Sequence, residues 1–205
     1  MQIFFWILIV VFGYWLGNIN GAIIISKLMM KDDVRSHGSG NAGLTNFFRT
    51  YGGLQTLLVI VIDAAKCVVA CWIAADIINL PEYALLAKMV AGAAVILGHS
   101  YPAAAGFRGG KGILSGAALA ACTDWRIFVL ILTVFVVAVL LTRYVSLGSV
   151  LAATFFAVGY LVFHWGNWPV CVLAVSAAAF VIFRHRSNLV RLVKGTESKL
   201  TFHKK

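Results

Sequence analysis

The chain is built from long apolar runs separated by short polar segments. Hydrophobic residues fill 61% of its 205 positions and charged residues only 12%, whereas about one quarter of the residues in a soluble domain are charged. A chain with so little polar surface would aggregate in water. The runs therefore predict an all-α integral membrane protein, because a helix satisfies its own backbone hydrogen bonds in lipid.

Seven runs approach the roughly 20 apolar residues that a spanning helix needs. They cover residues 3–28, 53–73, 83–97, 112–122, 126–141, 145–164 and 168–183. The third and fourth runs are short and are joined by a Gly/Pro-rich loop, so this pair could instead be one re-entrant element. No basic residue precedes the first run and no cleavage pattern follows it, which favours a retained helix over a signal peptide. We predict about seven transmembrane helices, give or take two, in a single domain over residues 1–205.

The basic residues predict the orientation of these helices. With the N-terminus outside and the C-terminus in the cytoplasm, the cytoplasmic segments carry Lys27, Lys31, Arg35, Arg49, Arg108, Lys111, Arg143, Arg184, Arg186, Arg191, Lys194, Lys199, Lys204 and Lys205. The external segments carry Arg126, together with Asp76, Glu82 and Asp124. This asymmetry follows the positive-inside rule. The net charge of +10 then belongs to one face, where it also favours contact with anionic lipid headgroups.

Three cytoplasmic segments hold nearly all of the polar chemistry. Their sequences are "SHGSGNAGLTNFFRTYG" (36–52), "GHSYPAAAGFRGGKG" (98–112) and "RHRSNLVRLVKGTESKL" (184–200), and a shorter piece, "TRYVS" (142–146), lies on the same side. Loops that only connect helices would not need so many Gly, Ser, Asn and Arg residues. We therefore expect one shared site at the cytoplasmic interface of the membrane.

The second of these segments has the composition of an anion site. Gly109, Gly110 and Gly112 would let backbone N–H groups converge on a phosphate, and Arg108 and Lys111 would add charge. A helix starting near Gly112 would point its dipole at the same anion. The segment is not a nucleotide P-loop, because that motif needs a glycine where Ala105 stands and a Ser or Thr where Gly112 stands. The alternative is a flexible turn with anchoring cations.

The first segment offers a second glycine-flanked site. Its "GSGN" at 38–41 holds the Ser39 hydroxyl between two glycines. A helix beginning near Leu44 would put Thr45 and Arg49 on one face, and arginine suits bidentate phosphate binding. The alternative is ordinary capping of that helix by Ser39, Asn41 and Thr45, which would leave Arg49 unexplained.

The third segment is expected to extend the last span into the cytoplasm as a helix. At helical spacing Arg184, His185, Asn188 and Arg191 form one polar stripe. Glu197 is the one carboxylate of this tail, and we expect it to be a structural ion-pair partner of the surrounding cations.

Three further polar residues are expected to be structural. Asp63 and Lys66 lie three residues apart inside the second predicted span, so they can neutralise one another at membrane depth. His99 follows a glycine at a helix end, where a histidine usually has a structural partner.

The ordered motifs resemble those of a known family. "SGNAGLTNFFR", "GHSYPAAAGFRGGKG", "TRYVSLGS" and "HRSNLVRLVKGTESK" are similar, in that order and over nearly the whole chain, to the bacterial acyl-phosphate:glycerol-3-phosphate acyltransferases, the PlsY family. The resemblance implies a multi-pass enzyme of the bacterial cytoplasmic (inner) membrane. Such an enzyme moves a fatty acyl group from acyl phosphate to the sn-1 hydroxyl of glycerol 3-phosphate, giving lysophosphatidic acid and phosphate, the first acylation step of phospholipid synthesis.

The resemblance also implies site residues. By position, the catalytic residues would be Ser39, Arg49, His185 and Asn188, with Glu197 as a structural residue. The expected substrate- and phosphate-binding residues are Gly38, Gly40, Asn41, Thr45, Arg108, Gly109, Gly110, Lys111, Gly112 and Ser146. Two positions depart from the family pattern, because Ala42 replaces a usual proline and Cys67 a common glycine. Neither departure removes a functional group.

The identity of the general base stays open. Acyl phosphate carries a good leaving group, so the enzyme mainly has to orient it and stabilise charge on its carbonyl oxygen. The proton of the acceptor hydroxyl could pass to His185 or to a substrate phosphate, whose second pKa of about 6 leaves the dianion well populated at neutral pH. We favour the substrate phosphate, with His185 positioning it.

The expected partners are the two substrates and the lipid bilayer. We expect no cofactor and no nucleic acid. We also expect no metal, since the four cysteines (Cys67, Cys71, Cys122 and Cys171) lack metal-binding spacing. Functional coupling to the enzyme that produces acyl phosphate is also expected. The main alternative function is a membrane carrier for an organic phosphate, although carriers place cationic sites at mid-membrane between two similar halves and no such repeat is visible.

Overall fold

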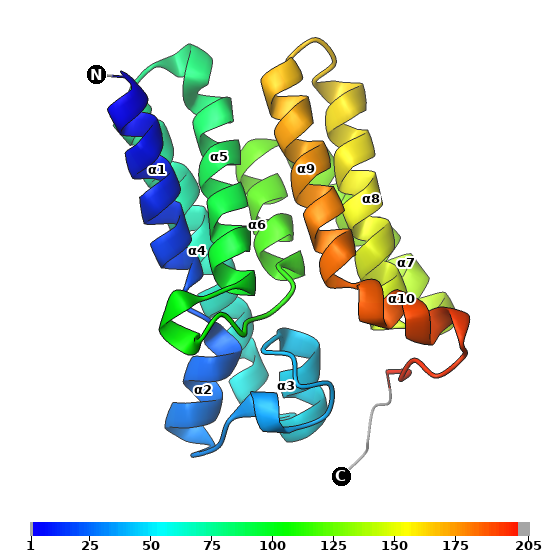
Figure 1. The fold of residues 1–205 in the computed structure, drawn as a ribbon. Coiled ribbons are helices and arrows are strands. Elements are labelled where there is room, and N and C mark those ends of the chain that lie inside the picture. The colour runs from blue at the N-terminus through cyan, green and yellow to red at the C-terminus, as the bar shows by residue number, and fades with distance from the viewer. Residues whose placement is uncertain (1, 201–205) are drawn as a thin grey trace. The chain divides into compact units, whose positions relative to one another are not determined.

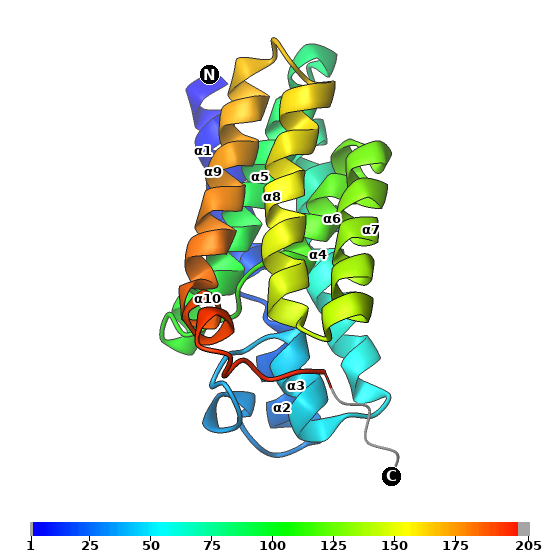
Figure 2. The same cartoon turned by 90° about the vertical axis from the view of Figure 1, so that its right-hand side faces the viewer.

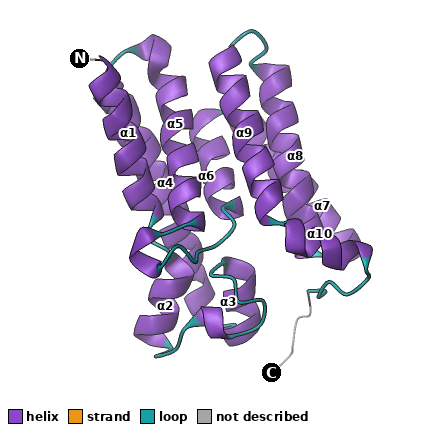
Figure 3. Ribbon diagram, in the orientation of Figure 1, coloured by secondary structure: helices purple, strands orange, loops and turns teal. Residues whose placement is uncertain are grey.

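The structure, a computed structural model, describes residues 2–200 and is built from helices joined by loops (Figure 3). No strand occurs within that range, which agrees with the predicted all-α class. The chain divides into two compact units, Met1–Thr123 and Asp124–Lys205. A single functional domain over both units stays a prediction. Lys204 and Lys205, which contributed to the predicted orientation, lie outside the described residues.

The first unit carries six α-helices and two short 3₁₀ turns (Figure 1). Its elements are α1 (Gln2–Gly17), α2 (Gly21–Met29), η1 (Val34–Ser36), α3 (Leu44–Tyr51), α4 (Gln55–Ile78), α5 (Pro81–Ser100), η2 (Ala103–Ala105) and α6 (Ile113–Thr123). The second unit consists of α7 (Trp125–Thr142), α8 (Val145–Phe163), α9 (Trp168–Arg184) and α10 (Arg186–Val193).

All seven predicted apolar runs are helical. Five segments are long and apolar enough to cross a membrane: Ile3–Met29, Gln55–Ile78, Pro81–Ala105, Trp125–Thr142 and Val145–Phe163. A sixth is added if α9 and α10, which meet at a bend of 57°, count as one span. Helix α6 has 11 residues and is shorter than a span. The count lies within the predicted margin, and the orientation of the termini stays a prediction.

The first predicted run, 3–28, is not one continuous helix. It breaks between α1 and α2, where Asn18 Nδ2 donates to the carbonyl of Tyr14 (2.7 Å) and Asn20 Oδ1 accepts from the Ile23 N–H (3.0 Å). Asn20 therefore caps the start of α2, as a polar N-cap residue does in general. Asn18 and Asn20 thus interrupt the helix although the residues on either side are apolar.

Helices α1 and α5 pack closely because glycines face one another. A Cβ atom at Gly17 would lie 2.5 Å from the carbonyl oxygen of Val95 and 2.8 Å from the Cα of Gly98. A Cβ at Gly98 would collide with the carbonyl oxygen of Tyr14. Small residues at such contacts let helix backbones approach in a membrane, where van der Waals packing drives helix association.

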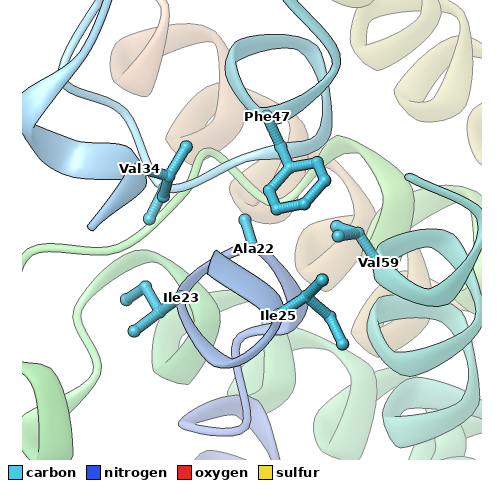
Figure 4. Packing of buried hydrophobic residues seen from close by; sticks show 7 residues of the cluster. Ala22, Ile23, Ile25, Val34, Phe47 and Val59 are labelled. Carbon is cyan, nitrogen blue, oxygen red and sulfur yellow. The ribbon is translucent and has the colours of Figure 1, made fainter. Parts of the chain in front are cut away.

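Helices α2 and α3 and the start of α4 share a small apolar core of their own (Figure 4). Its fully or nearly buried members are Ala22, Ile23, Ile25, Val34, Ala42, Phe47 and Val59. In Figure 4, Val34 and Phe47 lie beside Ala22 of α2. This core anchors the polar segment between α2 and α3 at the same end of the unit as the loop between α5 and α6 (Figure 1).

In the second unit, α7, α8 and α9 run alongside one another and α10 turns away from α9 (Figure 2). Helix α10 contacts both α8 and α9. The segment after α10 returns to the turn between α7 and α8, where the Leu200 N–H donates to the Arg143 carbonyl (2.7 Å). The Lys199 ammonium lies 5.5 Å from the ring centre of Tyr144 in the same turn.

Candidate active site

Asn46 organises the first-motif loop, which we define as residues 37–43. This side chain is 4% exposed, and its Oδ1 accepts from the Ser39 N–H (3.0 Å). Its Nδ2 donates to the carbonyls of Val34 and His37, both at 3.0 Å. Sequence reasoning missed Asn46, although an amide with two donors and two acceptor lone pairs is well suited to bridge a loop to a helix.

The glycines of this loop allow backbone conformations that other residues rarely adopt. Gly38 has φ +53° and a Cβ there would collide with Asn46 Oδ1, so no larger residue fits. Gly40 has φ +68° and donates its N–H to the His37 carbonyl (2.9 Å). The N–H groups of Ser39 and Gly40 are used inside this loop, so an anion bound there would not contact these backbone donors. Ser39 itself is exposed, so its hydroxyl is the group offered to a ligand.

Helix α3 begins at Leu44, as predicted. Its N-cap residue is Gly43, with no side-chain capping bond, so capping by Ser39, Asn41 or Thr45 does not explain those residues. Arg49 is exposed one helical turn after Thr45. The start of this helix thus places a hydroxyl and a guanidinium on one face.

The Gly-rich loop, residues 106–112, is held against the end of α5. The N–H groups of Gly109 and Gly110 donate to the carbonyls of Ser100 (3.3 Å) and His99 (3.0 Å). A Cβ at Gly110 would collide with His99 Nε2 and lie 2.8 Å from the carbonyl oxygen of Ala42. The predicted anion nest at Gly109 and Gly110 is therefore wrong. Buried backbone donors need partners, and these two N–H groups donate to carbonyls at the end of α5.

Anion binding at the Gly-rich loop would thus rest on other groups. Arg108 is exposed and Lys111 is partly buried. Gly112, with φ +83°, turns the chain into α6, which begins at Ile113 as predicted. The first N–H groups of a helix lack intrahelical partners and attract an anion, so the two cations lie next to a favourable helix end.

Arg35 contacts the Gly-rich loop from the turn before the first-motif loop, and Asn20 holds the first-motif loop itself. Arg35 donates from Nη1 to the carbonyls of Ala105 (2.8 Å) and Arg108 (3.4 Å), and its guanidinium pairs with Asp33 at 2.7 Å. That hydrogen-bonded pairing outweighs burial and lowers the pKa of Asp33 to about 2. Asn20 Nδ2 donates to the carbonyl of Ala42 (3.0 Å). The first unit therefore brings the first two predicted segments together.

In the second unit, His185 lies at the bend between α9 and α10. The predicted continuous stripe from Arg184 to Arg191 is wrong in this respect, because the helix changes direction by 57°. The His185 ring is 4% exposed, and its Nδ1 is 2.8 Å from the carbonyl of Val181. A carbonyl only accepts, so Nδ1 carries the proton and Nε2 of the neutral ring is the nitrogen with the lone pair.

Glu197 holds the rest of this segment together. Asn188 Nδ2 donates to Glu197 Oε1 (2.8 Å) and Arg191 Nε donates to Oε2 (2.7 Å), so the expected ion pair is present. Burial alone would raise the pKa of Glu197, but the hydrogen bonds from Asn188 and Arg191 outweigh it and hold this pKa below its usual range. Ser146 is buried in the first turn of α8, next to the carboxylate rather than in a separate binding loop.

The residues expected to be structural form a buried cluster in the first unit. Lys66 Nζ lies 2.8 Å from Asp63 Oδ1 and 2.8 Å from His99 Nδ1. No group of three or more His, Cys, Asp and Glu side chains between residues 2 and 200 is arranged to hold a metal ion.

The fold and the site residues define a class of protein: a multi-pass membrane protein with hydroxyl and cationic side chains in loops at helix ends of its first unit, and an imidazole at a helix end of its second. Comparison with known proteins identifies the family within that class. The sequence profile described as "Glycerol-3-phosphate acyltransferase" matches residues 7–195. The chain therefore belongs to the glycerol-3-phosphate acyltransferase family, and it is a membrane acyltransferase. This membership favours the enzyme over the organic-phosphate carrier.

Individual relatives agree with the family match. A glycerol-3-phosphate acyltransferase of Thermoanaerobacter pseudethanolicus is 36% identical over 196 residues, 95% of either chain. One of Shouchella clausii is 40% identical over 195 residues, 93% of this chain and 94% of the relative.

Two solved structures share the fold. The crystal structure of PlsY (YgiH), an integral membrane glycerol 3-phosphate acyltransferase, in its glycerol 3-phosphate form matches with a TM-score of 0.87 at 31% identity over 96% of both chains. Its lysophosphatidic acid form matches with a TM-score of 0.82 at 30% identity, covering 96% of this chain and 95% of the other.

Proposed function

We propose that the chain transfers a fatty acyl group from acyl phosphate to the sn-1 hydroxyl of glycerol 3-phosphate. The products are lysophosphatidic acid and phosphate, and the enzyme acts in the bacterial cytoplasmic membrane as the first acylation step of phospholipid synthesis. The observation that carries the proposal is the family match over residues 7–195. The resemblance of the ordered motifs to acyl-phosphate-dependent enzymes supports the choice of donor.

The reaction exchanges one acyl bond for another. The acceptor hydroxyl oxygen attacks the carbonyl carbon of acyl phosphate, an ester bond forms, and the C–O bond to phosphate breaks. Phosphate leaves with the bonding electron pair, and the hydroxyl proton passes to a base. Because the donor is a mixed anhydride, the enzyme mainly has to align the two substrates and stabilise negative charge on the carbonyl oxygen.

The first unit supplies groups suited to the two phosphates. In the proposal, Lys111 and Arg108 at the start of α6 bind the phosphate of glycerol 3-phosphate, and Arg49 on α3 provides a bidentate contact to an anion. The exposed Ser39 hydroxyl hydrogen-bonds to the reacting acyl phosphate. Asn41 and Thr45 flank the same surface, while Gly38, Gly40, Gly109, Gly110 and Gly112 shape the two loops.

The second unit supplies His185 and Asn188. His185 Nδ1 contacts the carbonyl of Val181, so in the proposal the other ring nitrogen, Nε2, accepts a hydrogen bond from the acceptor substrate. We propose that His185 orients the acceptor hydroxyl while a substrate phosphate takes its proton. Asn188, held by Glu197, would position the same substrate. We also propose functional coupling to the enzyme that makes acyl phosphate.

A liposome experiment tests this function. Purified protein is reconstituted with radiolabelled glycerol 3-phosphate outside the vesicles, with and without palmitoyl phosphate. We expect labelled lysophosphatidic acid in the lipid phase when palmitoyl phosphate is present, and no label in the lumen without it. Uptake of the label without an acyl donor would contradict the enzyme and support a carrier.

A further inference from the structure

The break between α1 and α2 is stabilised by a buried ion pair on α4, which Asp63 and Lys66 form at 2.8 Å. Lys66 Nζ donates to the carbonyls of Gly17 (3.4 Å) and Ile19 (2.7 Å), and Asp63 Oδ1 accepts from the Gly21 N–H (3.1 Å). The ammonium thus lies at the C-terminal end of α1 and the carboxylate at the N-terminal end of α2. Both charges match the helix dipoles and satisfy backbone groups that a broken helix leaves without partners.

Lys66 also fixes the ring of His99. The 2.8 Å contact between Lys66 Nζ and His99 Nδ1 joins the ring to the ion pair, and Asp63 Oδ1 lies 3.5 Å from the same ring nitrogen. The Nε2 side of the ring lies directly against Gly110. The carbonyl of His99 accepts from the Gly110 N–H at 3.0 Å. His99 therefore holds the Gly-rich loop through both its ring and its backbone.

Asn20 extends the same cluster to the first-motif loop. Its Oδ1 caps α2 at Ile23 (3.0 Å), and its Nδ2 donates to the carbonyl of Ala42 (3.0 Å) and lies 3.5 Å from His99 Nδ1. The carbonyl of Ala42 also packs against Gly110. One amide side chain therefore lies at the junction of α2, α5 and both loops.

We propose that Asn20 and Lys66 are positioning residues, which together with Asp63 and His99 fix the first-motif loop relative to the Gly-rich loop. The inference rests on the proposed function, because Ala42 lies three residues after Ser39 and Gly110 directly precedes Lys111.

The burial of this cluster makes its geometry rigid. Asn20 and Asp63 are each 1% exposed, and Lys66 and His99 are each 4% exposed. A buried polar group that loses its partner is costly, so each member is confined to the arrangement that satisfies the others. A site that binds two phosphates through separate loops depends on this confinement, since small errors in position cost rate and affinity.

Asn20→Ser separates positioning from folding. Serine is a good N-cap residue, so the variant keeps an acceptor for α2, but the shorter side chain cannot reach the Ala42 carbonyl. The first-motif loop would then lose its contact with Asn20 and bind the acceptor in a less well-fixed position, so we expect the KM for glycerol 3-phosphate to rise about fivefold or more. The KM for palmitoyl phosphate should stay within about twofold, and Tm should stay close to that of the wild type.

Lys66→Met is the second variant, and Lys88→Met is its matched control. Lys88 lies in the same unit and donates to the carbonyl of Cys122 (3.3 Å). It precedes His99 by eleven residues on α5, roughly 16 Å along the helix, and so lies away from both loops. Lys66→Met should raise the acceptor KM at least as much as Asn20→Ser, and Lys88→Met should leave it unchanged.

The wild type is assayed first, because absence of product from palmitoyl phosphate and glycerol 3-phosphate would contradict the proposed function and this inference with it. With an active wild type, an unchanged acceptor KM in Asn20→Ser overturns the positioning role. A lower apparent kcat at unchanged KM overturns it as well, since a smaller folded fraction gives that result. If Lys66→Met does not fold, Asn20→Ser decides the question alone.

Discussion

The exposed Ser39 hydroxyl depends on a buried amide seven residues later. Asn46 holds the Ser39 N–H at 3.0 Å and leaves the glycine at 38 no room for a side chain. In the same way, His185 depends on Val181 for its tautomer and Asn188 on Glu197 for its orientation. At the scale of single residues, each proposed reacting group has a neighbour that fixes its geometry.

His185→Gln tests which group is the general base. Glutamine reaches the position of Nε2 and can hydrogen-bond to the acceptor, but it cannot take up a proton at neutral pH. Because we assign the proton to a substrate phosphate, the variant should retain a tenth or more of kcat in a steady-state assay at pH 7. A loss of a thousandfold or more with normal folding would make His185 the base instead.

Glu197→Gln tests the structural role of the carboxylate through pH. The pKa of Glu197 in the folded protein lies below its ordinary value of 4.5, so its ionised form stabilises the fold above pH 4.5 and this contribution disappears as pH falls through the lowered pKa. The variant should therefore have a lower Tm than the wild type from pH 5 to 8, and the difference should shrink below about pH 4.5. A Tm difference independent of pH would contradict the assignment.

At the scale of elements, the apolar runs were sufficient to predict the helices, and local composition was sufficient to predict where α3 and α6 begin. The break between α1 and α2 was missed, although Asn18 and Asn20 lie at it, because the backbone groups that it exposes find partners in Asp63 and Lys66, more than forty positions later. A hydropathy pattern describes residues that are neighbours in the sequence, so it does not reveal a contact between residues this far apart.

The glycine loops show the same limit. The sequence of the Gly-rich loop predicted that its backbone N–H groups would face a ligand, but Gly109 and Gly110 donate to carbonyls at the end of α5. A run of glycines indicates that the backbone lies very close to some other group. Whether that group is a ligand or another part of the protein depends on the fold. The candidate cations and hydroxyls were predictable from sequence, and the residues that hold them, Asn20, Arg35 and Asn46, were not.

Gly110→Ala tests this interpretation of the Gly-rich loop. A Cβ would collide with His99 Nε2, and overpacking of this kind costs about 1–3 kcal/mol, so Tm should fall and the folded yield should drop. Gly116→Ala is the matched control, since a Cβ there would meet only Ile96 at 3.9 Å and alanine favours the helix.

Lys111→Ala should behave differently from Gly110→Ala. It removes a charge without adding volume, so Tm should change little while the KM for glycerol 3-phosphate rises at least tenfold, about 1.4 kcal/mol. Differential scanning fluorimetry and the two KM values distinguish the variants. An unaltered Tm in Gly110→Ala would mean that the loop is not packed on α5.

For the whole molecule, the account requires both units to present their motifs to the same side of the membrane. With the native cysteines replaced, single cysteines are introduced at Ser36 in the first unit and at Ser187 and Asn167 in the second, all exposed positions. The positive-inside rule places Ser36 and Ser187 in the cytoplasm and Asn167 outside. A membrane-impermeant thiol reagent should label Asn167→Cys in intact spheroplasts, and Ser36→Cys and Ser187→Cys only after lysis. If only one of Ser36→Cys and Ser187→Cys were labelled in intact spheroplasts, the motifs of the two units would lie on opposite sides of the membrane, which would contradict the account.

The choice of acyl donor tests the central claim most directly. Purified protein is incubated with glycerol 3-phosphate and, in separate reactions, palmitoyl phosphate, palmitoyl-CoA or palmitoyl-acyl carrier protein, and lysophosphatidic acid is measured by mass spectrometry. We predict product from palmitoyl phosphate alone, in equal amount to the phosphate released. Product from a thioester but not from palmitoyl phosphate would contradict the account.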